Sequence, residues 1–187
     1  MPSMSPYDKA PKVAPELLQS TSDRVISIRR ISKVTAGGKN MRFNALVALG
    51  DGQGRIGIGL GKATAVPDAV RKGVATARRN VIEIPMSGTT IPHVSQNKFR
   101  SSQVLLKPAP PGTGVVAGAT VRAIMELTGI RDVLTKAMGS RNPINLAKAT
   151  VDALASMSPR EIPTPASPAI SIDGGTGLDS TERTNAN

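Results

Sequence analysis

The chain contains no cysteine or tryptophan, and only three of its 187 residues are aromatic. Without cysteine it can form neither a disulfide framework nor a zinc finger. No apolar run approaches the ~20 residues of a membrane-spanning helix, and the N-terminal residues lack the apolar core of a secretory signal. We therefore expect a cytoplasmic protein without a structural metal site.

Acidic residues are also scarce, most of all in the middle of the chain. Between residues 24 and 157 there are twenty Lys and Arg against six Asp and Glu, a net charge of +14, compared with +11 for the whole chain. A compact domain with this much charge of one sign repels itself unless a polyanion screens it. The composition therefore predicts a nucleic-acid-binding protein in which Lys and Arg contact phosphates.

Catalytic constellations are missing from the sequence. His93 is the only histidine, no partner that would orient it is evident, and the six carboxylates have neither paired nor metal-ligand spacing. The run Gly-Gln-Gly-Arg-Ile-Gly at 52–57 matches the glycine spacing of dinucleotide-binding loops. A strand pattern follows it, however, where a pyrophosphate site needs a helix N-terminus. We expect no catalytic residues and no cofactor; a phosphate-cofactor enzyme is an alternative that rests on this run alone.

Composition divides the chain into four parts. Residues 1–22 and 158–187 are rich in Pro and Ser or Thr, and such segments bury too little apolar surface to offset the entropy of ordering. We expect an N-terminal and a C-terminal tail here, with docking of a tail left open. Between them we expect two small α+β domains, at 23–86 and 87–157, each with its own aliphatic core.

The first domain has the pattern β-β-β-α. A β-branched run at 25–31, an alternating run at 43–49 and a third run at 56–60 predict strands, and the glycine-containing segments 36–39 and 50–54 predict hairpin turns between them. In the third run Gly57, Gly59 and Gly61 share one face, which lets a helix or RNA approach the backbone closely. A helix should begin at Pro67 and bury a stripe of apolar residues. The stripe consists of Val70, Val74, Ala77 and Val81.

The second domain is expected to be α+β, with strands first and helices after them. We expect strands at 89–93 and 103–107, then a helix over 115–127 that ends at Gly129. A short helix is predicted over 130–138. The last helix should begin at Asn142, a favourable N-cap that is followed by proline.

Basic residues gather at two places in the first domain. Arg29, Arg30, Lys33, Lys39 and Arg42 surround the predicted tip at Gly37-Gly38. A second cluster lies on the predicted helix and consists of Arg71, Lys72, Arg78 and Arg79. Modules that read single-stranded RNA stack bases on aromatic side chains, which this chain hardly has. We therefore expect binding to double-stranded or folded RNA through its shape and its phosphates.

Several strings resemble the bacterial small-subunit ribosomal protein five family, and they occur in order from about residue 23 to residue 157. In the first half they are Arg29-Arg30-Ile31-Ser32-Lys33 with Gly37-Gly38, the segment Gly-Asp-Gly-Gln-Gly-Arg-Ile-Gly-Ile-Gly at 50–59, Gly61-Lys62-Ala63, and Val66-Pro67 with Ala69. In the second half they are 106–109, 112–115, Ala117-Gly118, 121–123, 129–134 and 139–145.

This resemblance implies a first domain of the double-stranded-RNA-binding type and a second β-α-β-α domain. It also implies a place on small-subunit rRNA, beside small-subunit ribosomal proteins four and eight. The hairpin at 32–39 would reach toward the rRNA neck, near where spectinomycin acts. Gly114 and Arg122 would lie toward protein four and influence decoding accuracy. With the basic clusters, it gives a set of predicted RNA-binding residues. They are Arg29, Arg30, Ser32, Lys33, Gly37, Gly38, Lys39, Arg42, Arg55, Lys62, Arg71, Lys72, Arg78 and Arg79.

The chain departs from the family pattern at four positions. Ala36 replaces a usual basic residue before the double glycine, Ala65 a usual acidic residue, and Arg100 and Ala119 usual glycines. The first departure lowers the positive charge at the hairpin tip; the others leave the expected fold unchanged. We expect a protein that does not form a homo-oligomer. The residues themselves also allow a free-standing double-stranded-RNA-binding module that acts on diverse RNAs.

Overall fold

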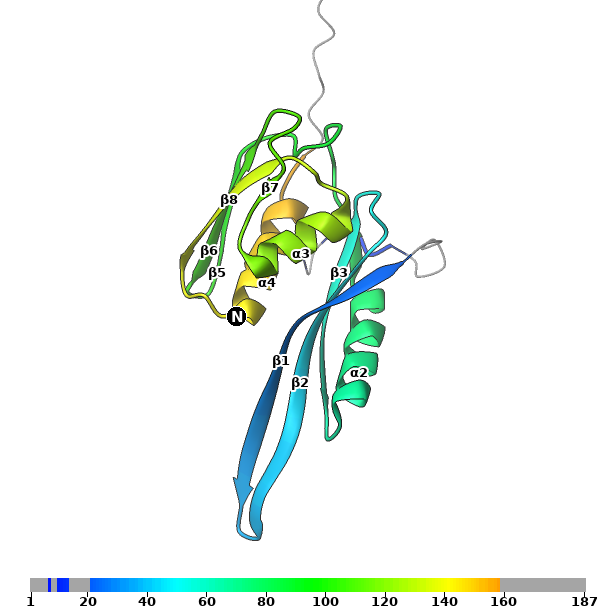
Figure 1. Ribbon diagram of the computed structural model, residues 1–187, viewed down its shortest axis with the longest axis vertical. Helices are drawn as coiled ribbons and strands as arrows, with labels where there is room; N and C mark the ends of the chain where they lie inside the picture. Colours follow the sequence, from blue (N-terminus) through cyan, green and yellow to red (C-terminus); the bar gives the residue numbers. More distant parts are fainter. Residues whose placement is uncertain (1–6, 8–9, 14–20, 159–187) are drawn as a thin grey trace, which may run out of the picture.

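In the computed structural model, which describes residue 7, residues 10–13 and residues 21–158, two four-stranded sheets are packed with three helices (Figure 1). The strand order is β1-β2-β3-β4 in the first sheet and β5-β6-β8-β7 in the second. The elements are β1 Ser22–Thr35, β2 Gly38–Gly50, β3 Arg55–Ala63, α2 Val66–Arg79, β4 Val81–Glu83, β5 Ser95–Phe99, β6 Ser102–Pro108, β7 Val115–Val116, α3 Ala119–Thr128, β8 Val133–Gly139 and α4 Pro143–Ala155. The α+β fold class expected from the sequence is confirmed.

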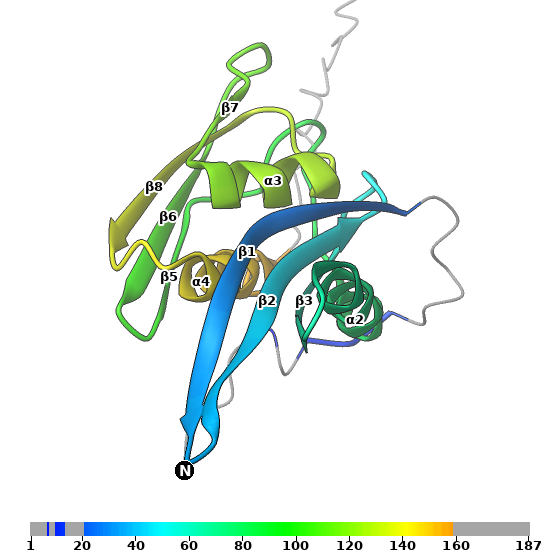
Figure 2. The ribbon, with the colours of Figure 1, turned by 60° about the horizontal axis from the view of Figure 1, so that its bottom comes forward.

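The helices divide between two positions. Helix α2 covers one face of the first sheet, whereas α3 and α4 lie between the two sheets (Figures 1 and 2). Strand β2 is therefore buried on both faces, and residues 44–50 are all buried. The alternation of apolar and polar residues over 43–49 predicts a strand buried on one face only. That prediction is wrong, because α3 and α4 cover the other face.

Strands β1 and β2 form a hairpin that extends far beyond the rest of the sheet. Their pairing runs from Ser22 opposite Gly50 to Thr35 opposite Gly38. Strand β3 pairs with β2 only as far as Phe43, so the outer part of the hairpin, residues 31–42, has no third strand beside it. The two strands leave the body of the molecule as a ribbon (Figure 1).

The glycine face of β3 packs against α2. A Cβ atom added to Gly61 would lie 1.9 Å from the carbonyl oxygen of Ala69, and one added to Gly59 would lie 2.1 Å from that of Gly73. Of the two partners that the glycines allowed, a helix or RNA, the helix occupies this face. The predicted apolar stripe is partly wrong: α2 buries Ala69, Gly73 and Ala77, because only small residues fit at this distance. Val70 and Val74 are only half-buried, and Val81 belongs to strand β4.

The second half differs from the predicted pattern at three places. No strand covers 89–93; the strand lies at Ser95–Phe99 instead. Residues 133–139 form strand β8, not a helix, because they pair with both β6 and β7, and this pairing outweighs local helix propensity. Residues 115–116 form a strand before α3. The two predicted helix ends are confirmed: Gly129 has a left-handed φ of 95°, and the Asn142 side chain accepts a hydrogen bond from the backbone of Ile144.

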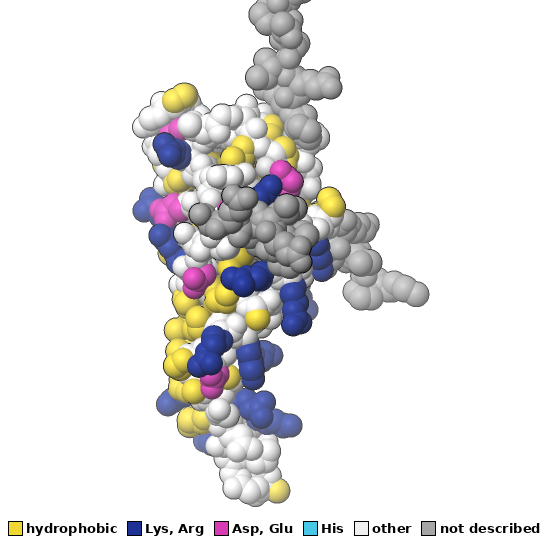
Figure 3. All heavy atoms as spheres, turned by 90° about the vertical axis from the view of Figure 1, so that its right-hand side faces the viewer, with side chains coloured by type: hydrophobic (Ala, Val, Ile, Leu, Met, Phe, Trp, Pro, Cys, Tyr) yellow, Lys and Arg dark blue, Asp and Glu magenta, His cyan; other side chains and the backbone are white. Residues whose placement is uncertain are grey.

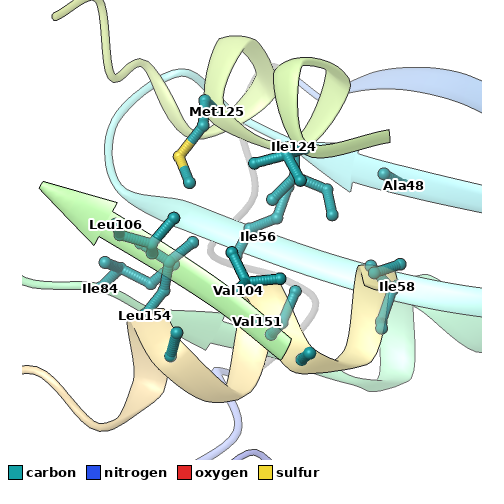
Figure 4. Close-up of a cluster of buried hydrophobic side chains, with 14 of the residues drawn as sticks. Ala48, Ile56, Ile58, Ile84, Val104, Leu106, Ile124, Met125, Val151 and Leu154 are labelled. Atoms are coloured by element: carbon teal, nitrogen blue, oxygen red, sulfur yellow. The ribbon is translucent and has the colours of Figure 1, made fainter. Parts of the chain in front are cut away.

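The largest apolar cluster is shared by both halves. Ile56 and Ile58 from the first sheet meet Val104 from the second, with Ile124 of α3 and Val151 of α4 between the sheets (Figure 4). The two clusters under α2 are much smaller. The expectation of one separate core for each half is therefore wrong, because α3 and α4 contribute apolar faces to both sheets at once.

The described part of the N-terminal segment is docked against both halves. Tyr7 is buried; its backbone N–H donates to Oδ1 of Asp152 on α4 at 3.0 Å, and its hydroxyl donates to the carbonyl of Asn80 at 2.5 Å. Lys12 forms a β-bridge with Ile82. Of the two possibilities, a loose or a docked tail, these residues are docked. Nearly all of the predicted C-terminal tail, 159–187, lies outside the described residues.

Candidate nucleic-acid interface

The basic side chains of the hairpin are distributed over its two faces. Directly paired residues of antiparallel strands point to the same side, and Arg42 is paired with Ile31, between Arg29 and Lys33 on β1. These three basic residues therefore share a face, which continues into the side of the sheet turned toward α4. All three are exposed and extend away from the core.

The opposite face of the hairpin combines charge with exposed apolar surface. Arg30 is paired with Phe43, and Lys39 with Val34, so both basic residues lie on the side that carries α2. Val34 is 70% exposed and Met41 49% exposed on this face. The hairpin thus presents cations in both directions, and its outer part, residues 31–42, contributes little to the core.

The tip of the hairpin tolerates close approach of a partner. A Cβ atom added to Gly37 would meet no described atom within 4 Å, and Gly38 has a φ of +130°, which favours glycine. Ser32 is exposed one residue before Lys33. No packing in the described chain requires Gly37, so its role must be sought outside the fold.

Helix α2 carries the second basic cluster on its exposed side. Lys72, Arg78 and Arg79 are exposed, and Arg71 is exposed while it forms an ion pair with Asp68 at 3.3 Å. Figure 3 shows Lys and Arg side chains along the side of the molecule that carries α2 and the hairpin, with fewer acidic side chains among them. Arg30 and Lys39 of the hairpin lie on this side of the sheet as well. The other three basic residues of the hairpin lie on the opposite face.

The two predicted site residues on β3 lie at opposite ends of that strand. Lys62 is exposed and paired with Asn44 at the base of the hairpin. Arg55 is half-buried beside the turn between β2 and β3, where its guanidinium lies 3.6 Å from the carboxylate of Asp51. The structure thus brings Lys62 together with the hairpin cluster but not Arg55.

Gly114 and Arg122 lie at one corner of the second half. The Arg122 guanidinium donates to the carbonyl of Val115 at 2.9 Å, and the backbone N–H of Gly114 donates to Oδ1 of Asp132 at 2.9 Å. Hydrogen bonds from the Gly114 backbone and the Thr89 side chain hold the pKa of Asp132 below its usual value, against the effect of burial. Asp132 thereby fixes the loop that presents Gly114.

Asn44, at the base of the hairpin, is a residue of the candidate interface that the sequence pattern did not predict. Its side chain is only 9% exposed, and within the described part of the chain its carbonyl oxygen Oδ1 has no hydrogen-bond partner. The strand pattern gave a signal, a polar residue in an otherwise apolar run, but placed it on a solvent-exposed face. Buried polar groups without a partner are uncommon and call for an explanation.

Residues 7, 10–13 and 21–158 contain no group of three His, Asp or Glu side chains that could hold a metal ion. Over the same residues, no helix is long and apolar enough to cross a membrane.

Comparison with known families finds two matches. Residues 21–85 match the N-terminal domain of ribosomal protein S5, and residues 97–163 match its C-terminal domain. Together the two matched ranges cover most of the chain, including both sheets.

Similar proteins carry the name small ribosomal subunit protein uS5. One from Rubrobacter xylanophilus is 58% identical over 132 residues, which are 71% of this chain and 66%, just under two thirds, of that protein. One from Thermotoga neapolitana is 52% identical over 141 residues, 75% of this chain and 79% of that protein. One from Chloroflexus aurantiacus is 48% identical over 150 residues, 80% of this chain and 84% of that protein.

Proposed function

The chain belongs to the ribosomal protein S5 family, and on that ground we propose that it is a structural component of the small ribosomal subunit that binds small-subunit rRNA. The observation that carries the proposal is the β1–β2 hairpin, which bears five exposed basic residues and whose outer part extends beyond the rest of the sheet and contributes little to the core. Exposed Arg and Lys neutralise phosphates where RNA segments converge. This role requires no catalytic group.

We propose that the hairpin enters the neck of the small subunit and stabilises it. A two-stranded ribbon with cations on both faces can contact two RNA segments at once, and a tip of small residues fits where space is limited. Lys62 and the basic face of α2 would hold neighbouring phosphates. Arg55, which lies apart from the hairpin cluster and forms an ion pair with Asp51, would make a separate RNA contact.

We propose that the corner formed by Gly114 and Arg122 contacts ribosomal protein four and contributes to translational accuracy, and that protein eight is a second neighbour. The fixed loop at Gly114 supports a protein contact, because a surface that is already ordered loses little entropy on binding. We also propose that the two domains comprise residues 23–86 and 87–157.

Two measurements test this function. Tagged protein should co-sediment with small subunits in a sucrose gradient; recovery with diverse double-stranded RNAs instead would favour the free-standing RNA-binding module. Binding of the purified chain to small-subunit rRNA should weaken with salt. If about six phosphates are neutralised, log K should fall against log salt with a slope of roughly −4 to −5. A slope near zero would contradict binding through phosphates.

A further inference from the structure

Three residues form a row across the base of the hairpin. Arg29 on β1 and Lys62 on β3 are each paired directly with Asn44 on β2, so the three side chains lie on one face of the sheet. The two cations are exposed, whereas Asn44 is buried between them. An amide is thus flanked on both sides by groups suited to phosphates.

A small hollow adjoins the Asn44 side chain. Its volume is about 10 Å³, close to the smallest space that holds one water-sized group. It is lined by Ser27, Arg29, Asn44, Leu46, Leu60 and Ile144. A larger cavity of about 230 Å³ shares Leu46, Leu60 and Ile144 with it. The hollow therefore belongs to the cleft between the first sheet and α4.

The chemistry of the row selects the group that completes it. An amide oxygen accepts hydrogen bonds and repels the oxygens of a phosphate, so its partner must be an O–H or N–H donor. Arg29 and Lys62 are suited to phosphates on either side of that donor. In RNA the 2′-hydroxyl lies within the backbone beside the phosphates, is the size of one water, and is absent from DNA.

We propose that Arg29, Asn44 and Lys62 form a subsite for one ribonucleotide of the bound RNA, in which Oδ1 of Asn44 accepts a hydrogen bond from the ribose 2′-hydroxyl. The proposal rests on the proposed RNA binding and adds discrimination between RNA and DNA to it. The aliphatic walls of Leu46, Leu60 and Ile144 exclude bulk water around this hydrogen bond, which makes a missing partner costly.

Asn44→Leu is the decisive variant, because it removes the amide and keeps the same branched arrangement of four side-chain heavy atoms. Since a buried oxygen without a partner destabilises the free protein, Asn44→Leu should melt at the same temperature as the parent or higher. We then let the variant compete with the parent chain for entry into small subunits reconstituted from an rRNA transcript. Asn44→Leu should be incorporated about two- to tenfold less than the parent. Opposite effects on stability and binding are not expected of a purely structural residue.

The donor is identified with a small-subunit rRNA transcript that carries sparse 2′-deoxy nucleotides tagged with phosphorothioate. Among the transcripts bound by the parent chain, 2′-deoxy nucleotides should be depleted at one or more positions. With Asn44→Leu, the depletion should disappear at one or more of these positions. Asn40→Leu is the matched control: Asn40 lies on the same face of β2 but is exposed, so its variant should retain that position.

Three results would overturn the subsite. These are an unchanged interference pattern with Asn44→Leu, loss of binding without loss of any deoxy-sensitive position, and early melting of both Asn44→Leu and Asn44→Ala, which would show that the amide has a partner within the fold. If only the Leu variant melts early, Asn44→Ala serves in the same assay. Failure of the parent chain to enter subunits would refute the proposed function itself.

Discussion

At the scale of single residues, the short distance between β3 and α2 is possible because the glycines of β3 have no Cβ atom. Carbonyl oxygens of α2 lie where a Cβ atom of Gly59 or Gly61 would be, so the helix rests on bare backbone. The facing positions on α2, Ala69 and Gly73, are correspondingly small. This contact holds α2 close to the sheet and so fixes the position of its exposed basic side relative to the hairpin.

Gly61→Ala should therefore destabilise the fold strongly. The new methyl group would lie 1.9 Å from the backbone oxygen of Ala69, and backbone cannot move aside cheaply. We expect a loss of about 3 kcal/mol or more in the free energy of unfolding, measured by urea denaturation. Gly37→Ala is the control, since its methyl group meets nothing, and it should change stability by less than about 0.5 kcal/mol. Equal effects would mean that α2 does not rest on the glycine face.

Asp132 should make the stability of the second half depend on pH. Because hydrogen bonds lower its pKa in the folded state, its contribution is fully present above the ordinary Asp value of about 3.9 and is lost as the pH falls toward the lowered value. Asp132→Asn should therefore be less stable than the parent at pH 7, and the difference in melting temperature between the two should become smaller below about pH 4. Thermal melts over a pH series measure this difference. If the difference does not depend on pH, the charge of the carboxylate is not its cause.

At the scale of elements, local signals succeeded where the chain contacts itself nearby. The Gly-rich turn after residue 49, the Asn142 cap and the glycine that ends α3 each depend on neighbours within a few residues, and all were predicted correctly. Strand β8 was missed because its strand state comes from pairing with β6, about thirty residues earlier. The buried position of Asn44 was missed for the same reason, since α3 and α4 cover that face from the other half of the chain. Periodicity carries no information about such distant partners.

The hairpin should matter more for function than for stability. Lys33 is exposed beyond the end of β3, so Lys33→Glu should shift the melting temperature by only a degree or two while it weakens rRNA binding and changes growth on spectinomycin. Lys136→Glu is the matched control, an exposed strand lysine outside the predicted site. Early melting with normal drug response would make the hairpin a structural element.

A basic residue in place of Ala36 should tighten rRNA binding on the scale of one phosphate contact, about 1 kcal/mol, and less at high salt.

At the scale of the whole molecule, two family domains share one principal core. Two separate family models match the two halves, yet the largest cluster joins Ile56 and Ile82 of the first sheet to Val104 and Leu106 of the second. Gly50 and the carbonyl of Leu127 are also in direct contact across the halves. A core of this kind holds the hairpin and the corner at Gly114 in a fixed relation, which suits a protein that would contact RNA with one half and a protein neighbour with the other.

The shared core makes unfolding of the two halves one event. We expect a single calorimetric transition whose van't Hoff and calorimetric enthalpies agree, because neither half can unfold without exposing the apolar surface of the other. A fragment that ends at Met86 should lack cooperative unfolding, since it loses α3 and α4 and leaves Leu46, Ile56 and Ile58 uncovered. Leu154→Ala on α4 provides the matched test within the full chain. It should lower the free energy of unfolding by about 2–5 kcal/mol, and unfolding should still occur in a single transition. If the fragment melts cooperatively on its own, or if Leu154→Ala separates a second transition, the halves are independent units. In that case the position of the hairpin relative to the second half would not be fixed by this chain alone.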